Sequence, residues 1–186
     1  HLSIRRQRQM CIRDRIKAIR SFIQQDVDYI VVAPVVETGW ETVLEEAKEA
    51  GIPVILSDRM MQVSDDSLFE AWVGGNFVKE GETCGNWLAD YLEAQGRGDE
   101  EINIVTIQGT IGASAQVGRT EGFANVLAEH SNWKMLDMQT GEFTQAKGQE
   151  VMESFLKSYD DIDVVICEND NEAFLSLIHI SEPTRL

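Results

Sequence analysis

The chain alternates short apolar runs with longer amphipathic segments, and this alternation restricts the fold more than any other feature of the sequence. Residues 29–34, YIVVAP, form a continuous apolar run that Pro34 stops, as expected of a strand covered on both faces. Residues 39–51, GWETVLEEAKEAG, carry apolar positions at helical spacing, and Gly51 closes the helix. Strands that alternate with helices predict an α/β fold with a mostly parallel sheet covered by helices.

The same two patterns recur as far as residue 170, with no low-complexity linker and no short repeat. Polar residues follow several of the apolar runs, and open α/β sheets bind their ligands at this end of the strands. Further strands are expected at residues 52–58, 71–75, 102–109, 134–141 and 163–170, and further helices at residues 16–25, 77–96, 119–130 and 145–159.

The two ends of the chain break this pattern. Residues 10–15, MCIRDR, and residues 175–180, LSLIHI, can be encoded by DNA sequences that are reverse complements of each other. Such a relationship indicates sequencing-library adapter that was translated together with a gene fragment. We therefore expect residues 1–15 and 175–186 to be adapter-derived and exclude them from the fold. The alternative is a natural basic N-terminal arm and a short apolar tail.

The charge balance restricts the partners. Lys and Arg number 16 against 32 Asp and Glu, which gives a formal net charge of −16. An acidic surface repels nucleic acid and anionic membranes, so we expect no nucleic-acid partner. No apolar run is long enough to span a bilayer, so direct membrane insertion is not expected either.

Three common kinds of site fit the sequence poorly. A phosphate cradle is conceivable at residues 109–114, GTIGAS, but this segment lacks the Lys-Ser/Thr of a P-loop, so a tight turn into a helix is preferred. Residues 168–172, ENDNE, lack the spacing and the glycine of a calcium loop. Nucleophilic catalysis needs a base beside Ser or Cys, and His130 lies at an expected helix end. We therefore expect no metal, no cofactor and no enzymatic activity.

A better set of polar residues lies at or near the ends of the expected strands. Asp58 and Arg59 follow one apolar run, Asn169 follows another, and Arg119 lies shortly after a third. Sugar hydroxyls donate and accept hydrogen bonds, which suits carboxylates, the rigid guanidinium fork and amides. Phe143 can supply an aromatic face for the apolar side of a sugar. Each residue alone could equally have a plain surface role, and only the set favours a sugar site.

Several longer segments together resemble the periplasmic sugar-binding proteins of ABC transporters, of the ribose/galactose type. The shared patterns are GIPVILSDR, GASAQVGRTEGF, GEFTQAKGQEVMESF and DIDVVICENDNEA, and the segments APVVETGWETVLEEAKEAGIPV and QGTIGAS are most similar to the galactofuranose-binding branch. The resemblance covers essentially all of residues 16–174. It implies the type I fold of this family, in which two Rossmann-like lobes with mostly parallel sheets enclose the ligand.

The resemblance also implies roles for individual residues and a division into lobes. Asp58 and Arg59 correspond to the sugar-hydroxyl pair of the first lobe, Arg119 to the guanidinium of the second lobe, Phe143 to a stacking ring and Asn169 to a ligand amide. Residues 16–75 would form part of the N-terminal lobe and residues 76–174 most of the C-terminal lobe. Both lobes would be incomplete, so we expect weak or no sugar binding by this fragment alone.

The function implied by the resemblance is capture of a monosaccharide of the galactofuranose, galactose or ribose class for import. The expected partner is an ABC transporter permease, the expected state is a monomer, and the expected location is the periplasm, or the cell exterior with a lipid anchor. The alternative is the effector-binding domain of a lactose-repressor-type transcription regulator, which a basic helix-turn-helix ahead of residue 16 would reveal. A sensory domain of a membrane receptor and an enzyme on a doubly wound sheet are two further alternatives.

Overall fold

A computed structural model describes residues 12–174, which divide into two compact units between Gly75 and Asn76. Unit 1 comprises the described residues up to Gly75, and unit 2 comprises those from Asn76 onward. Each unit contains a three-stranded sheet, and every strand pair in both sheets is parallel. The predicted α/β class with parallel sheets is confirmed.

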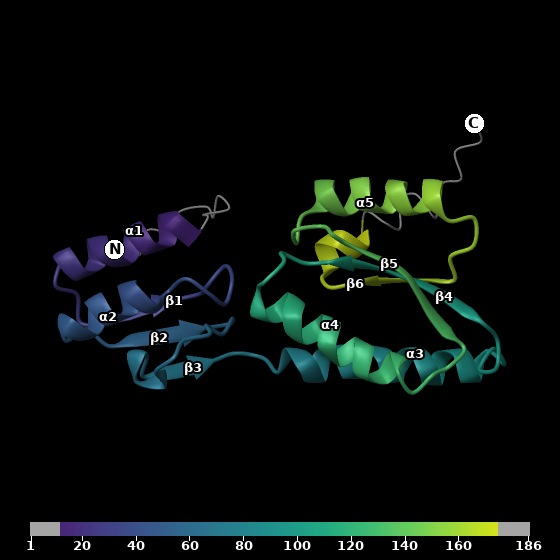
Figure 1. Cartoon of the computed structure of the whole chain (residues 1–186), viewed down its shortest axis with the longest axis horizontal. Coiled ribbons are helices and arrows are strands. Elements are labelled where there is room, and N and C mark those ends of the chain that lie inside the picture. The colour runs from purple at the N-terminus through teal and green to yellow at the C-terminus, as the bar shows by residue number, and fades with distance from the viewer. Residues whose placement is uncertain (1–11, 175–186) are drawn as a thin grey trace. The chain divides into compact units, whose positions relative to one another are not determined.

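Unit 1 is a three-stranded sheet with its strands in chain order, β1-β2-β3 (Figure 1). Gly51 ends the second helix of the unit as predicted, because it follows the capping residue with a φ of +72°, a conformation that glycine adopts at little cost. The elements are α1 (Ile12–Gln24), β1 (Ile30–Val32), α2 (Glu41–Glu49), β2 (Val54–Ser57), the 3₁₀ helix η1 (Asp66–Leu68) and β3 (Ala71–Val73).

The core of unit 1 lies on one face of its sheet. Ile30 and Leu56 point into a cluster that includes Ile19 of α1 and Leu44 of α2. The prediction that the run 29–34 is covered on both faces is wrong for the described residues, because Val31 of β1 is 64% exposed. Successive side chains of a strand point to opposite faces, and no described helix of unit 1 buries the face that carries Val31.

Unit 2 has its first strand in the centre of the sheet, in the order β5-β4-β6. Figure 1 shows α3 and α4 on one side of this sheet and α5 on the other. This arrangement covers both faces, as the alternating pattern predicted. The elements are α3 (Phe77–Ala94), β4 (Ile102–Gln108), α4 (Ser114–Leu127), β5 (Trp133–Thr140), α5 (Gln145–Ser158) and β6 (Val164–Cys167).

Strand β4 is buried on both faces. Ile102 and Ile104 belong to the cluster that α3 and α4 cover, and Val105 and Ile107 belong to the cluster that α5 covers. All four side chains are fully buried, which explains why apolar residues of this strand point to both of its faces.

Helices α3 and α4 touch through their backbones at glycines. A Cβ atom added to Gly81 would lie 2.3 Å from the carbonyl oxygen of Arg119, and one added to Gly122 would lie 2.0 Å from that of Val78. Helix α4 begins at Ser114, five residues before the predicted start at residue 119. The prediction missed this first turn because glycines such as Gly118 usually disfavour helix, whereas here they permit the close contact.

The first helix also begins earlier than predicted. Residues 12–15 belong to α1, where Ile12 packs against the core of unit 1 and Arg15 donates a hydrogen bond to the carbonyl of Ala33. The rest of the segments expected to be adapter-derived, residues 1–11 and 175–186, lies outside the described residues. The adapter origin of both ends stays a prediction.

Candidate functional site

Arg119 is held at the carboxyl end of the unit 2 sheet. It lies on α4, its side chain is partly buried, and its Nη1 donates to the backbone carbonyl of Glu168 at 2.6 Å. Its Nε donates to Oε2 of Glu80 on α3 at 2.9 Å, and its guanidinium lies 5.3 Å from the ring centroid of Phe77. These contacts fix the direction of the guanidinium plane, because Arg presents its donors in a rigid fork.

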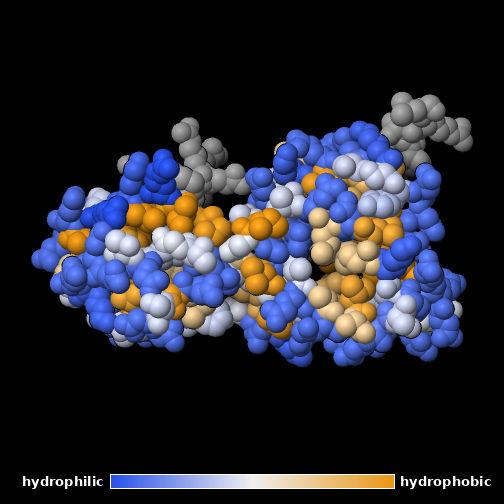
Figure 2. All heavy atoms as spheres, in the orientation of Figure 1, coloured by the Kyte–Doolittle hydropathy of each residue, from blue (hydrophilic) through white to orange (hydrophobic). Residues whose placement is uncertain are grey.

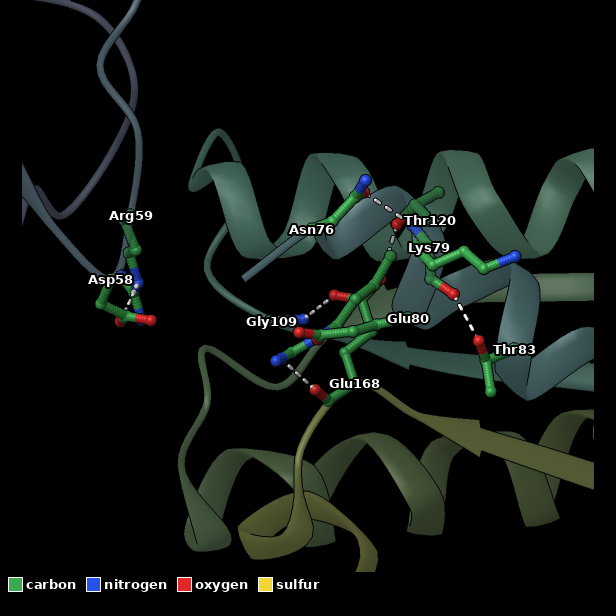
Figure 3. Close-up of polar contacts among 10 residues, drawn as sticks. Asp58, Arg59, Asn76, Lys79, Glu80, Thr83, Gly109, Thr120 and Glu168 are labelled. Atoms are coloured by element: carbon green, nitrogen blue, oxygen red, sulfur yellow. Dashed lines mark hydrogen bonds and ion pairs between the residues drawn. The ribbon is translucent and has the colours of Figure 1, made fainter. Parts of the chain in front are cut away.

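Glu168 is the first residue after β6, and its buried carboxylate joins two other segments of unit 2. Oε2 accepts from the backbone N–H of Gly109 at 2.7 Å, and Oε1 accepts from the hydroxyl of Thr120 at 2.6 Å (Figure 3). Burial raises the pKa of the Glu168 carboxyl, and these two hydrogen bonds and the charge of Arg119 oppose the rise. The carboxylate therefore ties the turn after β4 and the middle of α4 to the end of β6.

The polar network around Glu168 continues into the β4–α4 turn. The Thr120 hydroxyl accepts from the side-chain amides of Gln108 and Gln116, each at 3.0 Å. Gln116 in turn accepts from the backbone N–H of Gly112. Gln108 and Gln116 are themselves buried, so satisfied polar groups help to fix the turn. The turn in GTIGAS is thus a structured lead into α4.

Phe143 lies in the loop between β5 and α5. Its ring packs against Gly109, where an added Cβ atom would lie 1.9 Å from the ring. Phe143 and the preceding Glu142 have φ values of +58° and +55°, in the left-handed region that costs free energy for residues other than glycine. The Phe143 N–H donates to Oε1 of Glu172 at 2.9 Å, which holds this loop in place.

Asn169 begins the short helix that follows β6. Its Oδ1 accepts from the N–H of Glu172 at 2.9 Å, in the manner of a helix N-cap, and its Nδ2 donates to the carbonyl of Phe143 at 3.4 Å. Both polar atoms of the amide therefore contact the protein itself. The ligand role predicted for Asn169 stays a prediction.

Glu172 is fully buried between the end of β6 and helix α5. Glycines make room for it, because a Cβ atom at Gly148 would lie 3.1 Å from its Cα and one at Gly141 would lie 2.6 Å from its Oε1. Its Oε2 has no hydrogen-bond partner among the described residues. Burial raises the pKa of Glu172 from 4.5 to about 7, and the neighbouring charge of Glu168 adds to the rise.

Asp58 and Arg59 lie at the carboxyl end of β2 in unit 1. The backbone of Asp58 is left-handed, with a φ of +66°, and its N–H donates to the carbonyl of Val73. The Asp58 side chain is largely exposed, and its carboxylate lies 3.8 Å from Nε of Arg59. Nη1 of Arg59 donates to the carbonyl of Val35. Figure 3 shows this pair within its own unit.

The five predicted site residues thus form two groups. Unit 1 brings Asp58 and Arg59 together, and unit 2 brings Arg119, Phe143 and Asn169 together around the ends of β4 and β6. A single site made of both groups stays a prediction. Sequence reasoning missed Glu168 and Glu172, although an acidic residue directly after a predicted strand was an available signal for Glu168.

Unit 2 also contains a cavity of about 500 Å³ between its sheet and helices α3 and α4. Apolar side chains such as Leu127 and Met135 line most of it, and Arg119, Glu168 and Asn169 line its polar end. Figure 2 shows hydrophobic atoms around a hollow on the visible face of this unit.

Residues 12–174 contain neither a cluster of candidate metal ligands nor a helix that could span a bilayer. No three His, Cys, Asp or Glu side chains in this range gather in a way that could hold a metal ion. No helix in the same range combines the length and the apolar character needed to cross a bilayer.

Known proteins share both the sequence pattern and the fold. A family model described as a periplasmic binding protein domain matches residues 11–180. The galactofuranose-binding protein YtfQ of Escherichia coli strain K12 is 44% identical over 172 residues, which are 91% of this chain and 52% of that protein. The ribose import binding protein RbsB of Bacillus subtilis strain 168 is 31% identical over 159 residues, which are 86% of this chain and 48% of that protein.

A solved structure gives the same result. The periplasmic binding protein component of the arabinose ABC transporter from Shewanella sp. ANA-3, bound to alpha and beta-L-arabinofuranose, is 46% identical with a TM-score of 0.87. The match covers 94% of this chain and 57% of that one. The chain therefore spans about half the length of these relatives.

Proposed function

Because the chain belongs to the periplasmic binding protein family, we propose that it is part of the sugar-binding component of an ABC importer. The proposed ligand is a monosaccharide in its furanose form. Two relatives support this class, since one is named for galactofuranose and the other was solved with arabinofuranose. The ribose-binding relative supports a monosaccharide more generally.

The observation that carries the proposal is the guanidinium of Arg119. The protein uses its Nε and Nη1, and its Nη2 donates to no described residue. A donor with its direction already fixed binds a sugar hydroxyl with little loss of side-chain entropy. Arg119 also lines the cavity of unit 2 together with Asn169, and the Phe143 carbonyl accepts a hydrogen bond from the Asn169 side chain.

Asp58 and Arg59 are proposed as the second group of sugar contacts. The exposed carboxylate of Asp58 can accept from hydroxyls, and Arg59 can donate to them. In this proposal both groups contact the same sugar, and the change of conformation on binding signals the loaded state to the permease.

We propose no catalytic role. The relatives named above are binding proteins. His130, the sole histidine within residues 12–174, stacks on Trp133 with the ring centroids 4.1 Å apart. Trp133 is the first residue of β5, so His130 lies at the amino end of the parallel strands and offers no base to a Ser or Cys nucleophile at their carboxyl ends. We further propose that the protein acts as a monomer with the importer permease as partner, in the periplasm or anchored by lipid outside the cell.

The test is calorimetry on the protein made from the complete reading frame that contains residues 16–174. We expect saturable binding of a single sugar among L-arabinose, D-galactose and D-ribose. Absence of binding to these and to other monosaccharides would overturn the proposal. Binding to operator DNA that a sugar relieves would instead support the regulator alternative.

A further inference from the structure

We propose that Glu168 and Glu172 are positioning residues, which hold the three segments that carry Arg119, Phe143 and Asn169 in the arrangement that binds the ligand. Neither carboxylate is proposed to touch the sugar. That the two acids hold these segments follows from the geometry of unit 2. That the segments bind a ligand rests on the proposed function.

Glu168 uses both oxygens of its carboxylate at once. One oxygen accepts from the backbone N–H of Gly109 and the other accepts from the hydroxyl of Thr120. Its own backbone carbonyl accepts from Arg119, the residue next to Thr120. A single residue therefore fixes α4 at two neighbouring positions, and a shift of Glu168 would turn the guanidinium of Arg119.

Glu172 holds the loop of Phe143 from the other side. Its Oε1 accepts from the N–H of Phe143, which has left-handed backbone together with Glu142. This conformation is unfavourable for both residues, so it needs an interaction that compensates for it. The bond to a buried carboxyl supplies this interaction, and the ring of Phe143 then lies against Gly109.

Asn169 links the two acids. It follows Glu168 directly, and its Oδ1 caps the helix turn that carries Glu172. Its Nδ2 donates to the carbonyl of Phe143, the same residue whose N–H Glu172 binds. The β4–α4 turn, the β5–α5 loop and the end of β6 are thus joined in one network.

The two acids differ in the number of acceptors that they use, and this difference makes the proposal testable. Glu168→Gln keeps one acceptor but turns an NH₂ group toward a second donor, so one of the two bonds is lost. Glu172→Gln keeps the acceptor for Phe143, because only one oxygen of Glu172 has a partner. Glu168→Gln should therefore lose one of the hydrogen bonds that hold the segments in place, and Glu172→Gln should keep its bond. Glu172→Leu should lose the bond to Phe143.

Residue-resolved amide hydrogen exchange by NMR on the 186-residue chain measures the loops directly. We expect Glu168→Gln to speed exchange by about tenfold, as for the loss of one hydrogen bond to a charged group. The faster exchange should appear either at the Gly109 amide or at the α4 amides around Thr120, according to which of the two the glutamine NH₂ group faces. Glu172→Leu should speed the exchange of Phe143 similarly, and Glu172→Gln should leave it unchanged. Glu121→Gln, an exposed change of the same charge on α4, is the control.

Parent-like protection both of Gly109 and of the α4 amides around Thr120 in Glu168→Gln would overturn the role of Glu168. Equal Phe143 protection in Glu172→Leu would overturn the role of Glu172. If Glu168→Gln does not fold, Thr120→Val and Thr120→Ser provide the test. The valine variant removes one donor to Glu168, so it should loosen α4 around Arg119, and the serine variant should restore the parent exchange.

Calorimetry with the complete reading frame, with L-arabinose and D-galactose as probes, connects the network to the ligand. We expect Glu168→Gln and Glu172→Leu to weaken binding by about tenfold, and Glu172→Gln and Glu121→Gln to bind as the parent does. Parent-like affinity in both weakened variants would overturn the link to binding. If the parent binds no sugar, the proposed function fails, and the exchange experiment alone decides the positioning role.

Discussion

Unit 1 and unit 2 each contain a parallel sheet of three strands, but the faces of the two sheets are buried to different extents. In unit 2 helices lie on both faces, and Val105 of β4 is fully buried. In unit 1 the described helices cover one face, and Val31 of β1 and Val73 of β3 are largely exposed on the other. The comparison teaches that an apolar run predicts a strand but not how many layers cover it.

The candidate site residues of the two units also differ in how far the surrounding protein buries and supports them. Arg119, Phe143 and Asn169 of unit 2 contact a buried polar network, and two buried carboxylates support it. Asp58 and Arg59 of unit 1 form one long ion pair beside backbone contacts, and the carboxylate is exposed. We therefore expect the unit 2 group to be preorganised and the unit 1 pair to adjust to the ligand.

The largest expected effect separates the stabilities of the two units. Gly122→Val on α4 would drive a side chain into the backbone of α3, where the carbonyl of Val78 lies 2.0 Å from the added Cβ. We expect a loss of about 3 kcal/mol or more in the free energy of unfolding of unit 2. Amide exchange of Ile104 should rise and that of Leu56 in unit 1 should not.

Gly51→Ala is the matched control for this change. Gly51 has a φ of +72° but open space around its Cα, so only backbone strain of about 1 kcal/mol is expected, in unit 1. Loss of protection in both units after Gly122→Val would mean that the units do not fold independently.

The next effect compares the two groups of site residues in the complete reading frame. Arg119→Ala should weaken sugar binding by about 1.5–3 kcal/mol, or about tenfold to a hundredfold, because it removes a fixed donor. Arg119→Lys should lose less, and Asp58→Asn should also weaken binding because it removes the charged acceptor. Calorimetry is the measurement, with Lys157→Ala on the exposed side of α5 as the control. Unchanged affinity in Arg119→Ala would remove Arg119 from the site.

A third effect tests the difference in burial by replacing one valine with alanine in each unit. Val105→Ala in unit 2 should cost about 2 kcal/mol, because it leaves a cavity between two layers. Val31→Ala in unit 1 should cost less than about 0.5 kcal/mol, because this side chain is 64% exposed. Urea unfolding followed by amide exchange measures both values. A similar cost at the two positions would show that Val31 is covered in solution.

The smallest effect concerns pH. A carboxyl whose pKa rises on folding stabilises the folded state below its unfolded pKa, and this stability is lost as the pH rises through the folded pKa. For Glu172 the window runs from 4.5 to about 7, with Glu168 and Arg119 as the charged neighbours. Unit 2 should lose about 1.5 kcal/mol between about pH 5.5 and about pH 7.

Glu172→Gln should flatten this dependence, since glutamine resembles the neutral carboxyl at every pH. Urea unfolding at the two pH values measures the change, and Glu121→Gln is the control. A parent-like pH dependence in Glu172→Gln would assign the effect to another group.

Most of the fold could be predicted from the sequence because strands and helices have different apolar periods. The run 102–109 and the helix 77–96 were recognised in this way, and the structure places β4 and α3 there. The first turn of α4 was missed because its glycines are required by the neighbouring helix, which a local pattern does not contain. The open face of unit 1 was missed for the same reason, since burial depends on what packs against a strand.

The site was predictable only in its outline. Arg119 and Asn169 could be selected because they follow apolar runs, and the structure brings them to the same end of unit 2. Glu168 and Glu172 lie in the segment ENDNE, but their partners Gly109, Thr120 and Phe143 are far away in sequence. Long-range hydrogen bonds of this kind leave no periodic signal.

The glycine contact between α3 and α4 has a mechanical consequence. Where two helices meet through backbone atoms, no side chain can change its rotamer to absorb a displacement, so we expect α3 and α4 to move as one rigid body. Arg119 belongs to this rigid helix pair, because its carbonyl is the atom that faces Gly81. Asn76 caps the start of α3, and it directly follows Gly74 and Gly75, which come after β3. We therefore expect a change of backbone direction at Gly74 and Gly75 to move Arg119 together with both helices.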